Sequence, residues 1–358
     1  MYEFFYTNYS KCSNQANQYF FSTWQGLANT CHFIQLFGVP MEVITAYVIV
    51  KKSPKVMKTI KAPLLNSHLW CSLSDFSIGA LATPYYYIPS LAGFHVGILS
   101  DLGVPIPVQL VIMTFFLIGM GISIIYLFEN RSSSILENRF RISKRSTRVF
   151  YYAVLYFLNY LVFLILLKSP RDQESSRKAI LKTLTCPTSE FLELPAFVLL
   201  DDPFWIAILN FYIVPAIYIN ILANILFHAF CCVYYLYLFP SVSTSNQIKK
   251  LQRKFFLASV VQVSVPFLVV ILPFGAGTLA LLMGKFDQGF MNFLILVIGT
   301  HGLVQSFVII AINKPYRNWV VFVCRGTKIG ALYDSPMLQE IAEVAEINEM
   351  RQSQLVHI

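Results

Sequence analysis

The chain has 358 residues, of which 56% are hydrophobic, 15% aromatic and only 13% charged. Soluble domains carry about a quarter of their residues as charges, so this composition excludes an ordinary soluble domain and predicts a polytopic membrane protein. The formal net charge is +9, and its bases form short clusters between apolar stretches. We interpret these clusters as topology signals, and we expect no nucleic-acid partner.

Seven apolar stretches predict seven membrane-spanning helices, because each reaches the ~20 residues that cross a hydrocarbon core. In chain order they lie at about 27–50, 63–88, 107–128, 149–167, 204–239, 255–283 and 289–312. The fifth is long enough to hide two spans. No turn cluster interrupts it, and the single Pro215 is tolerated inside a membrane helix, so we interpret it as one span with a cytoplasmic extension. The predicted fold is an all-α seven-transmembrane bundle.

Lys and Arg are divided unevenly between the two ends of this bundle. Of the 27 bases, 20 follow spans one, three, five and seven. The positive-inside rule therefore puts the N-terminus outside and the C-terminus inside. The expected organisation is an extracellular N-terminus at 1–26, a seven-transmembrane domain at 27–317 and a cytoplasmic tail at 318–358. Asn8 begins an Asn-Tyr-Ser sequon, which makes it a glycosylation site on the outer side.

Two carboxyl side chains fall inside predicted spans. Glu42 follows Pro40 in the first span, and Asp75 lies about halfway along the second with Ser72 and Ser74 beside it. A charge at the bilayer centre costs about 2.5–3.5 kcal/mol on insertion scales, so both should face the bundle interior. Asp75 is a candidate intramembrane switch between two packings, and a structural hydrogen-bonding role is the alternative. For Glu42 we expect the structural role.

The third span ends in Glu129, Asn130 and Arg131. Arg131 could pair with a carboxylate in an inactive state and be released on activation. The alternative is an ordinary positive-inside arginine that reaches the lipid headgroups. The placement of Glu129 beside it, together with the family resemblance described below, favours the functional interpretation.

The last span ends in the sequence INKPYRNWVV. Pro315 cannot continue the amide ladder, so the helix should end or kink there. We expect Lys314 and Arg317 at the anionic cytoplasmic headgroups, and Tyr316 at the interface. A short interfacial helix should follow. Cys324 in that helix is a palmitoylation candidate, with a free thiol as the alternative.

The remaining titratable residues do not predict a catalytic centre. Four histidines fall in four different spans, without the spacing of a metal site: His32, His68, His228 and His301. No GxSxG, glycine-rich phosphate loop or intramembrane Asp pair occurs. We therefore expect no enzyme activity, no metal and no cofactor.

Seven cysteines occur without CxxC spacing, and only Cys12 and Cys186 lie in predicted outer segments. Lone cysteines in an oxidising compartment tend to pair, so we predict a disulfide between them. The alternative is that Cys12 is free or paired between molecules.

Several ordered motifs resemble the nematode serpentine chemosensory receptors of class H (Srh), in the Str superfamily. The matching residues are Asn66, Trp70, Asp75, Thr83-Pro84-Tyr85, Glu129-Asn130-Arg131, Gln252, Gln262, Pro266 and Pro315-Tyr316-Arg317. The related class I receptors share parts of this pattern. The resemblance implies an odorant or other small-molecule receptor in the plasma membrane of sensory cilia, coupled to a heterotrimeric G protein. It also implies coupling roles for 129–131 and 315–317, and a helix kink at Pro266.

A transporter or channel is the competing hypothesis. Transporters usually contain internal repeats, broken helices and several ionisable groups at the membrane midplane. Seven spans do not divide into matching halves, and only two acids are embedded here. For a receptor we expect the ligand cavity among the outer halves of spans three, five, six and seven.

Overall fold

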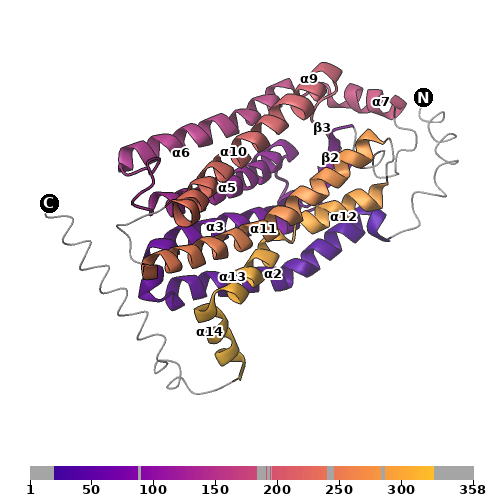
Figure 1. Ribbon diagram of the computed structural model, residues 1–358. Helices are drawn as coiled ribbons and strands as arrows, with labels where there is room; N and C mark the ends of the chain where they lie inside the picture. Colours follow the sequence, from indigo (N-terminus) through magenta and orange to yellow (C-terminus); the bar gives the residue numbers. More distant parts are fainter. Residues whose placement is uncertain are drawn as a thin grey trace.

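The computed structural model describes residues 20–87, 90–183, 191, 194, 196–239, 246–283 and 287–325. They form a bundle of long helices with a small sheet at one end (Figure 1). The α-helices are α2 (Trp24–Lys52), α3 (Lys58–Phe76), α4 (Ile98–Asp101), α5 (Ile106–Ser133), α6 (Arg145–Tyr160), α7 (Gln173–Thr183), α9 (Pro203–Ile208), α10 (Val214–Val233), α11 (Asn246–Leu282), α12 (Gln288–Ile298), α13 (His301–Ile312) and α14 (Lys314–Arg325). Shorter 3-10 and π segments are η1 (Phe20–Ser22), η2 (Lys55–Met57), η3 (Ser77–Ala82), η4 (Leu161–Lys168), η5 (Leu209–Ile213) and η6 (Tyr234–Leu238).

Within the described residues, six helices are long and apolar enough to cross a membrane. They are Trp24–Lys52, Ile106–Ser133, Arg145–Lys168, Pro203–Leu238, Gln247–Ala280 and Gln288–Ile312. They coincide with six of the seven predicted spans. The run Pro203–Leu238 is continuous, which confirms that the fifth apolar stretch is one helix.

The remaining predicted span is α3 with η3, which is more polar because it lies in the middle of the bundle. It packs against α2, α5 and α13. Its polar side chains are buried inside the protein: Ser67, His68, Ser74 and Asp75 are all fully buried. These inward-facing polar residues lower the hydropathy of α3, while Leu69 and Leu73 on its other side are 45% and 43% exposed.

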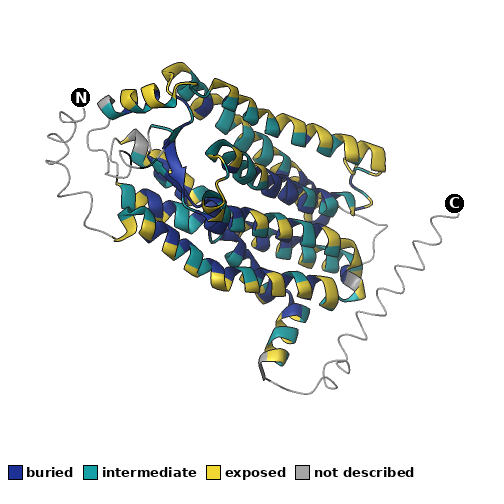
Figure 2. Cartoon of the chain, turned by 180° about the vertical axis from the view of Figure 1, so that it is seen from behind, coloured by how far each residue is buried: buried dark blue, intermediate teal, exposed yellow. Residues whose placement is uncertain are grey.

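The outer surface of the bundle is apolar and the interior is closely packed. Phe33, Leu36 and Phe37 on α2 have 61%, 70% and 62% of their surface exposed. Figure 2 shows the buried residues along the inner faces of the helices and the exposed ones along their outer faces. Large exposed apolar side chains of this kind suit a lipid environment.

The second span ends earlier than predicted, at Ala82 instead of about 88. Thr83 has a φ of 42°, and Pro84 disfavours a helical conformation for the residue before it. The chain then forms a three-stranded antiparallel sheet of β1 (Pro84–Tyr87), β2 (Ala92–His95) and β3 (Phe197–Val198). The apolar runs of the sequence do not predict this sheet.

The sheet carries an aromatic cluster over the end of the bundle opposite the basic loops. Tyr85, Tyr87 and Phe94 pack with Phe191 and Leu27. The Tyr85 hydroxyl donates a hydrogen bond to the Ser22 carbonyl at 2.8 Å. In the same region the buried His95 donates from Nδ1 to Gln109 Oε1 at 3.1 Å, and burial lowers the pKa of His95 to about 4. The imidazole is therefore neutral near pH 7.

The seventh span is broken at Gly299 and Thr300, between α12 and α13. The Thr300 hydroxyl donates to the Val297 carbonyl at 2.7 Å and does not cap α13. The N-terminus of α13 therefore depends on a partner from elsewhere in the bundle.

A short helix follows the last span, as predicted. Asn313 has an extended conformation (φ −87°, ψ 102°) and ends α13, and Pro315 lies in the first turn of α14. Figure 1 shows α14 leaving α13 at an angle. Its Trp319 packs against Tyr47 of α2, with ring centroids 5.6 Å apart.

Candidate functional site

Glu129 lies near the C-terminal end of α5, which is the third span, and its side chain is fully buried. Arg148 donates to Glu129 Oε1 at 3.0 Å, and Ser133 donates to the same oxygen at 2.6 Å. Tyr152 donates to Oε2 at 3.3 Å. Arg148 and Tyr152 both come from α6, so this carboxylate joins α5 to α6. Charge-assisted hydrogen bonds of this kind are the strong ones.

Arg131 points to a different helix. Its Nε donates to Ser259 Oγ of α11 at 3.2 Å, and its guanidinium lies 5.5 Å from the centroid of the Phe255 ring. Among the described residues Arg131 makes no ion pair, which differs from the expected pairing with a carboxylate. The arginine that pairs with Glu129 is Arg148.

A third contact joins α5 to α10. Ser132 Oγ lies 2.9 Å from His228 Nδ1, and Tyr151 of α6 donates to Asn224 of α10 at 2.7 Å. The segment Glu129-Asn130-Arg131-Ser132 thus contacts α6, α10 and α11 within one helical turn. Half-buried Asn130 lies between the two charged residues. A small movement of any of these helices would have to break one of these bonds.

The residues predicted at the end of the seventh span occupy two environments. Tyr316 is fully buried inside the protein, where it packs with Val48, Ile49 and Ile60. The Ser53 hydroxyl donates to the Ile49 carbonyl, so the Tyr316 hydroxyl donates to Ser53 Oγ, at 2.7 Å. This packing could not be predicted from the sequence, because the partners of Tyr316 come from α2 and α3, far away in the chain.

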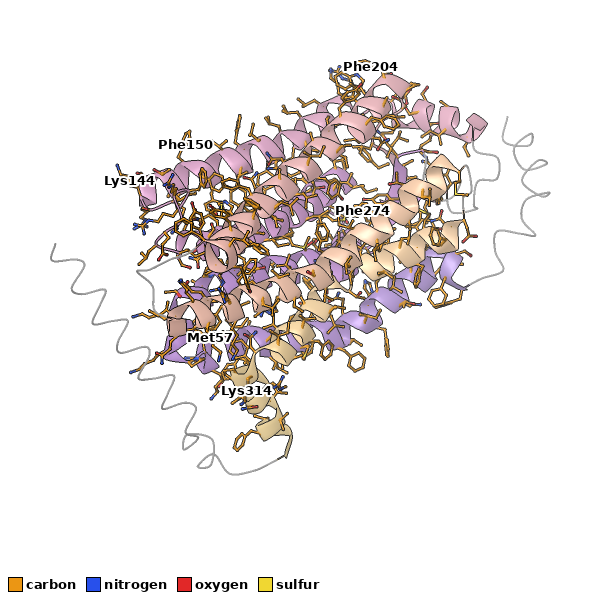
Figure 3. The ribbon with its side chains drawn as sticks, viewed as in Figure 1. Met57, Lys144, Phe150, Phe204, Phe274 and Lys314 are labelled. Atoms are coloured by element: carbon orange, nitrogen blue, oxygen red, sulfur yellow. The ribbon has the colours of Figure 1, made fainter. Side chains whose placement is uncertain are left out.

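Pro315 and Arg317 lie on either side of Tyr316. Arg317 donates from Nη1 to the Ala311 carbonyl at 2.7 Å, across the break between α13 and α14, and its side chain is exposed. Figure 3 shows Lys314, Met57 and Lys144 at one end of the bundle and Phe204 at the other. The two predicted coupling segments therefore belong to the same end of the protein.

A second candidate site lies within the bundle, around Asp75. The Leu303 N–H donates to Asp75 Oδ2 at 3.1 Å. Leu303 is the third residue of α13, so Asp75 supplies from α3 the cap that Thr300 does not provide. The Asp75 side chain thus satisfies one of the N–H groups that the first turn of a helix leaves without a partner.

Glu42 and two histidines complete this polar cluster. His68 Nε2 donates to the Glu42 backbone carbonyl at 2.9 Å, and His301 Nδ1 lies 3.8 Å from Asp75 Oδ1. A Cβ on Gly302 would lie 2.5 Å from Glu42 Oε1 and 3.0 Å from Asp75 Oδ2, so only glycine leaves room for both carboxyl groups. The prediction that the histidines form no metal or catalytic site stays a prediction. Here His68 and His301 lie beside the two acids, which sequence spacing could not show because three helices contribute.

The other predicted site residues are not tested by these contacts. Pro266 lies inside α11, and the kink there stays a prediction. Cys324 lies on α14, but its side chain is outside the described part of the chain. Asn8, Cys12 and Cys186 also lie outside the described residues, so the glycosylation site and the disulfide stay predictions.

Comparison with known proteins agrees with this architecture. Residues 22–325 match the model of the family described as serpentine type 7TM GPCR chemoreceptor Srh. The serpentine receptor class H-72 of Caenorhabditis elegans is 31% identical over 301 residues, which cover 83% of this chain and 85% of the relative. These matches confirm the resemblance to class H. The chain belongs to the Srh family of seven-transmembrane serpentine chemoreceptors.

Proposed function

We propose that this chain is a receptor for a small molecule that signals through a heterotrimeric G protein, which binds at the inner ends of α5, α11 and α13–α14. The observation that supports this most directly is the segment 129–132, which contacts three neighbouring helices at one end of the bundle. Membership of a chemoreceptor family favours this function over a transporter or channel.

The contacts suggest how activation would proceed. A ligand among the outer halves of spans three, five, six and seven can shift the equilibrium only if it binds one packing better than the other. The bond from Arg131 to Ser259 holds α5 against α11 in the packing described here. Its loss would free Arg131 for the G protein, while Glu129 stays bound to Arg148. Asp75 would act as the switch inside the bundle, because it connects α3 to the break in the seventh span.

The role of Arg131 is testable by mutation. Arg131→Ala should reach the cell surface and lose ligand-independent and ligand-driven signalling by on the order of tenfold or more, because one charged contact is worth about 1.5–3 kcal/mol. Second-messenger output at matched surface expression is the measurement. Arg139→Ala is the control, since Arg139 is an exposed base in the same loop. Equal signalling by both variants would make Arg131 a topological anchor only.

We further propose a plasma-membrane location with the N-terminus outside and the C-terminus inside, in sensory cilia. A C-terminal epitope should stain only after permeabilisation, and Asn8→Gln should remove a glycan. The 20 bases that follow spans one, three, five and seven in the sequence support this orientation. Staining of the C-terminal epitope on intact cells would contradict it. The Cys12–Cys186 disulfide and palmitoylation of Cys324 belong to the same proposal.

A further inference from the structure

A groove of about 670 Å³ lies between α5 and the start of α6. Arg145 and Arg148 line one part of it, and Tyr126, Val149 and Ala153 line the rest. The groove therefore combines cationic side chains with an apolar and aromatic wall.

The α6 side of the groove follows from helical periodicity. The lining positions 145, 148, 149, 152 and 153 recur at three- and four-residue spacing, which places them on one face of a helix. This face begins with two arginines and becomes apolar one turn later. A ligand lying along it would meet charge at one end and hydrocarbon at the other.

The groove is located where a membrane headgroup would lie. It opens at the first turn of the fourth span, beside Lys144, which Figure 3 shows at the basic end of the bundle. Val149 at the rim is 61% exposed, and Ala153 one turn further on is also exposed, so the apolar part faces outward to lipid. The segment 129–148 carries six bases and two acids, which leaves a positive charge around the groove.

The two arginines differ in the partners that they already have. Arg148 donates hydrogen bonds to Glu129 and to the Ile142 carbonyl. Arg145 is exposed, and within the described residues it makes no ion pair. A guanidinium presents a planar fork of N–H donors that matches a phosphate. Arg145 can therefore bind an anion. Arg148 lies one turn further along the same face of α6.

We propose that this groove binds an anionic phospholipid of the cytoplasmic leaflet, with its phosphate between Arg145 and Arg148 and an acyl chain along Tyr126, Val149 and Ala153. The leaflet assignment rests on the proposed orientation. Cytoplasmic leaflets are anionic, and each nearby base is attracted by about 1 kcal/mol. The bound phosphate shares Arg148 with Glu129, so the lipid is linked through Arg148 to the segment 129–132.

The test uses the full-length chain in phosphatidylcholine nanodiscs, with phosphatidylinositol added as the probe and bound lipid counted by native mass spectrometry. Arg145→Gln should weaken phosphatidylinositol binding by on the order of tenfold, the value of one charged hydrogen-bonding partner. Arg139→Gln removes the same charge from the connection between α5 and α6, outside the groove, and it should bind as the parent does. Equal weakening by the two variants would overturn the site, because it would show only general attraction to bases.

A third variant separates a lipid from a free phosphate. Ala153→Trp fills the apolar part of the groove at an exposed position, so the fold should tolerate it. It should weaken phosphatidylinositol binding and leave competition by soluble inositol phosphate unchanged. Unaltered lipid binding in Ala153→Trp would overturn the proposal. Both leaflets of a nanodisc contain the probe, so a wrong orientation leaves these outcomes unchanged and is detected by epitope staining instead.

Discussion

Replacing Arg148 by alanine should destabilise the protein by about 3–5 kcal/mol, because it leaves an unpaired carboxylate in the protein interior. Glu129 is fully buried, and its ion pair with Arg148 is 3.0 Å long. Ser133 and Tyr152 would still donate to it, but neither carries a charge. Surface expression and the temperature at which the detergent-solubilised receptor aggregates would both fall.

Glu129→Ala should cost less than Arg148→Ala, and this order is the specific part of the prediction. The Arg148 side chain is 34% exposed, so it can reach water or a lipid phosphate when its partner is removed. The double variant should be more stable than Arg148→Ala alone, since no buried charge remains. If Glu129→Ala were the more damaging change, the energy would come from the hydrogen bonds of Ser133 and Tyr152 and not from the ion pair.

The membrane helices were the part of the fold that sequence could predict. Lipid requires a long apolar surface, so spans such as Ile106–Ser133 and Pro203–Leu238 are visible as runs of hydrophobic residues. The helix break before α14 was also predicted, because Pro315 cannot continue the amide ladder. These features depend on local composition alone.

The features that were missed depend on contacts between distant segments. The third strand of the sheet, β3, pairs with β2 from about a hundred residues further along the chain. No proline marks the break at Gly299 and Thr300 in the sequence. The cap of α13 comes from Asp75, more than two hundred residues earlier in the chain. Local periodicity carries no information about such partners.

The candidate sites show the same division. Glu129 and Arg131 could be singled out from their place at the end of an apolar run. Their partners could not, because Arg148 is one of six bases in a loop that reads as a topology signal. Asp75 could be singled out because a carboxyl group inside a membrane span is costly unless it faces polar partners within the bundle. Its partner, a backbone N–H, belongs to another helix and could not be identified from the sequence.

Asp75→Ala should destabilise the bundle by about 1–3 kcal/mol, the cost of leaving a buried donor unsatisfied. The Leu303 N–H loses its acceptor, and α13 loses its only identified side-chain cap among the described residues. Asp75→Asn should be nearly neutral for stability, because the amide oxygen has the same position and still accepts from Leu303. Ser74→Ala is the matched control: Ser74 is fully buried, but its hydroxyl has no hydrogen-bond partner within the described residues.

The Asp75→Asn variant also distinguishes between the two roles considered for Asp75, a switch and a helix cap. It keeps the cap and removes the ability to exchange a proton or hold a cation. If Asp75 acts as a switch, Asp75→Asn should fold and reach the surface like the parent, yet change basal second-messenger output severalfold. A cap alone predicts parental signalling from Asp75→Asn and reduced surface expression from Asp75→Ala. Because the Asp75 side chain meets the N-terminus of α13, a change in its protonation would alter how α12 and α13 join, and α13 leads directly to Tyr316 and the proposed coupling surface.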